Sequence, residues 1–228
     1  NETAVLLRNA FIDTALGSRL AIPAELKTTG DPLTYIAQSR GPATAAFRRH
    51  ISASGGKIIS YIPNNAYLVR VDAVGAARLA NWSGTQSVLA FEPYYKLEMK
   101  LLEMALTGQA LPERALLNVV LFPNSEPAAA KRLAKLGVEV LSQDRTPFGA
   151  KLVARVPADK LAALARLTEV QGLERHRTRR LANDLTRPRL GVDVFNAETN
   201  GAGVVTKVTS TNHLGLTGNR IYVNVNDT

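Results

Sequence analysis

The chain has 228 residues, of which 28 are Lys or Arg and 19 are Asp or Glu, so its formal net charge is +9. Hydrophobic residues make up 46% and charged residues 21%, an ordinary globular composition that excludes a mainly disordered chain. There is no Cys, which excludes a disulfide scaffold, a thiolate zinc site and a cysteine nucleophile, and the longest apolar run, residues 115–122, is too short to cross a membrane.

The first set of predicted elements follows residues 1–34, which we expect to form an extended lead. Phe47 and Ile51 fall at helical spacing ahead of Gly55, which predicts an amphipathic helix that ends at this glycine. Asp72 is placed to cap a second helix. Strand, helix, strand, strand, helix and strand are predicted over residues 35–40, 43–54, 57–62, 66–71, 73–80 and 87–91, within a first domain of residues 35–98.

The same order of elements repeats after a linker, residues 99–117. Within this linker the sequence predicts a short helix that ends near Gly108. In the second domain, residues 118–182, Ser125 is placed to cap the first helix and Pro157 to begin the second. The repeated elements are predicted over residues 118–123, 126–136, 138–142, 150–156, 158–167 and 170–174.

Each set is a βαββαβ unit, the ferredoxin-like arrangement, in which four strands form one sheet and both helices cover one face. We therefore predict an α+β protein with two tandem ferredoxin-like domains. The second face of each sheet is left without cover, so the two copies could bury these faces against each other or against a third body. From residue 183 on, Gly, Asn, Thr and Val increase, and strands are predicted over residues 204–208 and 221–225.

The end of the chain carries the most specific motif. A Gly-rich turn, residues 214–218, leads into a strand-like run and then into Asp227-Thr228. This pattern resembles the start of the catalytic domain of subtilisin-like serine peptidases, in which a buried strand ends in Asp-(Ser/Thr)-Gly. Leu-Gly-Val-Asp at residues 190–193 is similar to the segment that opens the mature enzyme. The resemblance implies that residues 183–228 begin a subtilisin-like α/β domain and that Asp227 is the triad carboxylate.

The two repeats fit the same resemblance, because this family carries a βαββαβ propeptide before its catalytic domain. The resemblance implies an N-terminal proregion of a secreted or cell-surface serine endopeptidase, exported by a signal peptide since removed. Such a proregion is an intramolecular chaperone and inhibitor until the zymogen processes itself, and its partner is the catalytic domain of the same polypeptide. The chain has no catalytic His or Ser motif, so we expect it to be inactive alone and to need no cofactor or metal.

A basic run follows the last predicted strand of the second repeat. Residues 175–190 hold six Arg against one Asp, a net charge of +5. The resemblance places the processing junction here, with the segment after Glu174 lying in the substrate cleft as an added strand. This junction is assigned to His176, Arg177, Thr178, Arg179, Arg180, Leu181, Ala182 and Asn183. A nucleic-acid patch and a solvated strand edge blunted by charge are the alternative interpretations.

Two other classes of function stay open. RNA-recognition domains are also βαββαβ, but they need aromatic residues on their central strands to stack bases. The third strands of the two repeats offer only Tyr67, which argues against a nucleic-acid partner. Tandem ferredoxin-like domains could instead form a non-enzymatic module that binds a partner protein or has a structural role.

Overall fold

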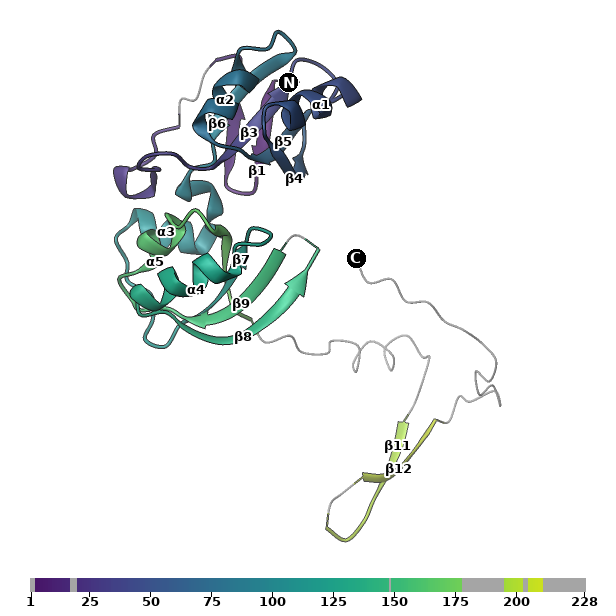
Figure 1. Ribbon diagram of the computed structural model, residues 1–228. Coiled ribbons are helices and arrows are strands. Elements are labelled where there is room, and N and C mark those ends of the chain that lie inside the picture. Colours follow the sequence, from purple (N-terminus) through teal and green to yellow (C-terminus); the bar gives the residue numbers. More distant parts are fainter. Residues whose placement is uncertain (1–2, 17–19, 148, 178–194, 203–204, 211–228) are drawn as a thin grey trace. The chain divides into compact units, whose positions relative to one another are not determined.

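The computed structural model describes residues 3–16, 20–147, 149–177, 195–202 and 205–210, and the chain divides into two compact units, Asn1–His176 and Arg177–Thr228 (Figure 1). Antiparallel sheets and short helices make this an α+β protein. In the second unit, β11 (Phe195–Thr199) pairs with β12 (Val205–Ser210) in an antiparallel hairpin. The strand predicted over residues 221–225 lies outside the described residues.

The first unit contains two four-stranded antiparallel sheets with the same strand order. In each sheet, the order is fourth, first, third, second when the strands are counted along the chain, which gives β6-β3-β5-β4 and β10-β7-β9-β8. The first sheet comprises β3 (Thr34–Ser39), β4 (Lys57–Ile62), β5 (Ala66–Arg70) and β6 (Thr85–Ala90). The second comprises β7 (Leu116–Leu121), β8 (Glu139–Thr146), β9 (Gly149–Arg155) and β10 (Val170–Arg175).

Helices α1 (Ala45–Ala53) and α2 (Ala73–Ala80) pack on one face of the first sheet, and together they form what we call the first module. Asp72 caps α2 as predicted, because its Oδ1 accepts a hydrogen bond of 2.7 Å from Gly75 N. The core between helices and sheet consists of Ala37, Phe47, Ile51, Tyr67, Val69, Val71, Ala76 and Leu79. The alternation of β3 and β5 thus directs one set of side chains to the helices.

The N-terminal segment is not the extended lead that the sequence predicted. It forms a hairpin of β1 (Ala4–Leu7) and β2 (Ala10–Asp13), followed by the short helix η1 (Ala24–Leu26). Val5 and Ile12 of the hairpin are 0% and 3% exposed, and they pack on the second face of the first sheet. Four-residue strands carry too little alternation to be recognised, and their stability comes from this packing.

Helices α4 (Glu126–Lys135) and α5 (Leu161–Ala165) pack on one face of the second sheet, and these elements form the second module. Helix α3 (Met99–Leu106), from the predicted linker, adds Leu101, Leu102 and Met104 to the same core. The remaining core side chains include Leu117, Val119, Leu121, Ala129, Leu133, Ala150, Leu152, Ala154, Leu161, Leu164 and Leu173.

Three predicted elements of the second module differ in extent. Strand β7 covers Leu116–Leu121 rather than residues 118–123. Helix α5 begins at Leu161 rather than at Ala158, because the Ala158 carbonyl accepts from Leu111 N (3.1 Å) and residues 157–160 form a turn. Strand β8 runs to Thr146, beyond the predicted end at Ser142, because its antiparallel pairing with β9 continues as far as the Thr146–Gly149 pair.

Candidate functional site

The second sheet has one face that its helices do not cover. Side chains of β7 and β9 alternate between the helix-covered core and this second face. The residues on it, which we call the open face, are Leu116, Asn118 and Val120 of β7, Lys151, Val153 and Arg155 of β9, and Gly172 and Glu174 of β10. All except Asn118 are partly exposed. The sequence predicted an uncovered face without naming these residues, and the buried alternation at Leu117, Val119 and Leu121 was the signal that could have identified them.

The corresponding face of the first sheet is covered by the β1–β2 hairpin. The sequence had predicted that the second face of each of the two sheets would be left without cover by its own repeat. Ile36 and Leu68 lie on the covered face of the first sheet and are 1% and 4% exposed under the β1–β2 hairpin. Asn64 Nδ2 donates to the Ala4 carbonyl of the hairpin at 2.7 Å. Of the two four-stranded sheets, the second therefore has the face that can receive a partner, although Arg8 of the β1–β2 hairpin already pairs with Glu174 of this face at 2.6 Å.

The two edge strands of the second sheet also differ in how far other segments occupy them. Along the β10 edge, Glu98 N donates to the Leu173 carbonyl (2.9 Å), and the Glu98 carboxylate accepts from Arg175 N (2.7 Å), so residues before α3 occupy this edge. The other edge is β8, which pairs with β9 alone among the described strands. Its Val140 and Leu141 are 43% and 44% exposed. An added extended segment would therefore find main-chain partners at β8.

The chain leaves the second module beside the open face. His176 N donates to the Leu116 carbonyl, and His176 Nδ1 donates to Asn118 Oδ1, both at 2.9 Å. This contact helps to bury Asn118, which is 8% exposed, while Arg177 is exposed. These are the first two residues of the predicted junction. The rest of that junction, residues 178–183, and the predicted triad residue Asp227 lie outside the described residues.

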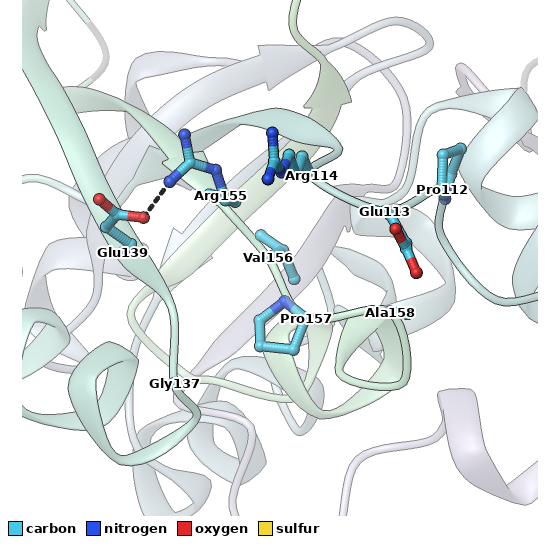
Figure 2. Close-up of a pocket in the computed structure, with 9 residues that line it drawn as sticks. All are labelled: Pro112, Glu113, Arg114, Gly137, Glu139, Arg155, Val156, Pro157 and Ala158. Atoms are coloured by element: carbon cyan, nitrogen blue, oxygen red, sulfur yellow. Dashed lines mark hydrogen bonds and ion pairs between the residues drawn. The ribbon is translucent and has the colours of Figure 1, made fainter.

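A hollow of about 360 Å³ lies at the end of the second sheet where β7 begins and β9 ends (Figure 2). Figure 2 shows Arg114 and Arg155 on one side of it, above Val156 and Pro157. Arg155 pairs with Glu139, which neutralises one of the two guanidinium groups. Of the predicted junction residues that the structure describes, neither His176 nor Arg177 lines this hollow. Its apolar floor and paired charge suit a protein contact better than acid–base chemistry.

No group of three or more His, Cys, Asp or Glu that could hold a metal ion occurs in the described ranges. Among the same residues, no helix combines the length and the apolar character that crossing a bilayer requires.

A family model described as a domain of unknown function (DUF8729) matches residues 6–92. The match begins within β1 and ends two residues after β6, so it covers most of the hairpin together with the first module. No curated protein matches the chain. The matched range agrees with the packing, since the hairpin and the first sheet share one core.

Proposed function

We propose that the chain is the N-terminal proregion of a secreted subtilisin-like serine endopeptidase, and that it assists folding of the catalytic domain and inhibits it until autoprocessing. In this proposal both modules are ferredoxin-like βαββαβ domains. The shared strand order and the placement of both helices on one face support that assignment.

The observation that carries the proposal is the position of the chain exit relative to the open face. His176 forms hydrogen bonds with Leu116 and Asn118 of the open face. The chain therefore leaves the second module at the surface on which a partner would dock. A catalytic domain on the open face would meet the basic junction at the same time. Main-chain hydrogen bonds from an extended junction segment would then fill the substrate cleft without any particular side-chain chemistry.

In the parent enzyme, Asp227 would orient the catalytic imidazole and stabilise its charged form during attack by a Ser hydroxyl. The chain carries neither the His-Gly-Thr-His nor the Gly-Thr-Ser-Met-Ala motif of this family. By this proposal the chain contributes one triad residue and the inhibitory segment, and the other two triad residues belong to sequence downstream of Thr228.

A second candidate function is a permanent protein-binding module with no peptidase attached. The covered face of the first sheet favours it, because a module whose surface is closed by its own hairpin has no need of a catalytic domain to bury that surface. The coding sequence after Thr228 separates the two candidates. The proregion requires Gly next and the two family motifs further on, and their absence there would leave the binding module.

Inhibition by the full chain tests the docking surface directly. The chain is titrated into the catalytic domain encoded downstream, or into another subtilisin-type peptidase, and hydrolysis of a chromogenic peptide is followed. Val120→Glu, in the middle of the open face, is expected to weaken inhibition by about tenfold or more, since it buries a charge in the interface. Ala130→Glu, on the exposed side of α4, is the matched control and should inhibit like the unchanged chain. Equal inhibition by both variants would remove the open face from the docking surface.

A further inference from the structure

The two modules are joined by a polar cluster that the proposed function does not use. Arg70, at the end of β5 in the first module, donates to Ser125 Oγ and to the Thr168 carbonyl of the second module, both at 3.3 Å. Its guanidinium carbon lies 5.1 Å from the centre of the Phe122 ring. Phe122 itself is fully buried and packs in the core shared by the hairpin and the first sheet.

Lys96 carries the buried amine of this cluster. It ends the short helix η2 (Pro93–Lys96) between the modules, is 7% exposed, and its Nζ donates to the Leu167 carbonyl of the second module at 2.9 Å. Glu169, 5% exposed, is the nearby buried carboxylate, and its Oε2 lies 3.4 Å from Arg132 Nη1 on α4. We call Arg70, Lys96 and Glu169 the junction cluster.

The charges around Lys96 do not balance. The pKa of Lys96 is lowered from 10.5 to about 7. Burial is the main cause and the charge of Arg70 acts in the same direction, whereas the negative charges of Glu169 and Glu92 raise the pKa. The Glu169 carboxylate is also shared with Arg132, and Glu92 accepts a hydrogen bond from Thr28 N (2.6 Å). A protonated Lys96 therefore places a second cation beside Arg70 in a buried site whose carboxylate is already engaged.

We propose that the junction cluster is a pH-dependent latch between the two modules, which holds them together when the Lys96 amine is neutral and loosens when the amine is protonated. The geometry supports this coupling, because Lys96 contacts the second module from the connecting segment while Arg70 contacts it from the first. Separation of the modules would expose the Lys96 amine to water.

The direction of the effect follows from proton uptake. In separated modules Lys96 would have the ordinary pKa of 10.5, so separation takes up one proton between about pH 7 and pH 10.5. The attachment is therefore strongest at alkaline pH and weakens as pH falls towards 7, by up to about tenfold in the equilibrium constant per pH unit. Below pH 7 Lys96 is protonated in both states, and the dependence from this residue ends.

The separation can be measured by energy transfer, because the chain has no Cys of its own. Ala53→Cys on α1 and Ala130→Cys on α4, both exposed, receive a donor and an acceptor dye. Urea is raised at fixed pH values from 7 to 9.5 until transfer is lost. In the unchanged chain, and with Lys100→Met at an exposed position, the modules should separate at higher urea as pH rises. With Lys96→Met this pH dependence should disappear.

The same pH dependence in all three chains, or none in the unchanged chain, would overturn the proposal. If Lys96→Met does not fold, the ε-carbon resonances of the lysines in the unchanged chain are titrated by NMR instead. One lysine that titrates near pH 7 supports the latch, whereas titration of every lysine near pH 10 refutes it.

Discussion

Val5→Asp should detach the N-terminal hairpin from the first sheet. Val5 is fully buried and packs with Ile12, Ile36 and Leu68 in the core between the hairpin and the sheet. Burial of one Val or Ile side chain is worth about 1.5–3 kcal/mol, so Val5 and Ile12 together hold the hairpin by roughly 3–6 kcal/mol. A carboxylate cannot stay unpaired in this core, and the hairpin is expected to release it to water by detaching.

The release sets an upper limit on the effect. Once the hairpin has detached, the variant has lost the free energy of hairpin docking and loses nothing further. We therefore expect the free energy of unfolding to fall by about 3–6 kcal/mol. Leu6→Asp is the matched control, because Leu6 is the next residue and is 42% exposed on the outer side of the same hairpin. Its cost should stay below about 1 kcal/mol.

Urea unfolding followed by Trp82 fluorescence measures this difference. Trp82 is the single Trp of the chain, and its ring lies 6.0 Å from that of Phe47 in the core of the first module. Val5→Asp should lower the urea midpoint and increase binding of a hydrophobic dye in the absence of urea, since the second face of the first sheet becomes exposed. Equal midpoints for Val5→Asp and Leu6→Asp would refute the conclusion that the hairpin stabilises the first module.

Three further outcomes are expected. Leu133→Asp should unfold the second module of the full chain, because loss of a buried Leu and burial of a charge together cost at least about 5 kcal/mol, whereas Ala134→Asp at an exposed position should leave circular dichroism unchanged. The purified chain should not hydrolyse casein, and hydrolysis blocked by a serine-directed inhibitor would contradict the assignment of Asp227 as a lone triad residue. If the chain is a proregion, N-terminal sequencing of the mature enzyme should place the cut within residues 180–190, near the Ala182–Asn183 bond, and a mature terminus beyond residue 203 would remove the junction.

Local signals in the sequence predicted much of the element order. Asp72 illustrates why, since its side chain caps α2 within three residues and depends on nothing distant. Ser125 marks the limit of such reasoning. It precedes α4 as predicted, but its hydroxyl makes no cap hydrogen bond and instead accepts from Arg70 of the other module. A contact between residues 55 positions apart leaves no local pattern in the sequence.

The candidate site was predictable as a type of surface and not as a set of residues. Alternation of apolar and polar positions predicts that a sheet with helices on one side has a second face to cover. Which segment covers it is decided by packing over long distances, as with Val5 and Ile36. For the same reason the buried Lys96 could not be identified from sequence, since a lysine beside Tyr95 and Leu97 looks like any surface lysine until its neighbours are known.

The two modules share a strand order, but different segments contact the second face of each sheet. Each sheet has a buried amide side chain on this face, Gln38 on β3 and Asn118 on β7. Gln38 Oε1 accepts from Thr14 Oγ1 of the N-terminal segment at 2.5 Å, and Gln38 Nε2 donates to the Asn64 carbonyl at 2.9 Å. Asn118 is satisfied by His176, where the chain leaves the second module. The N-terminal segment therefore covers the buried amide of the first sheet, whereas the beginning of the junction covers that of the second. A partner on the open face must contact that junction, and a partner on the helices need not.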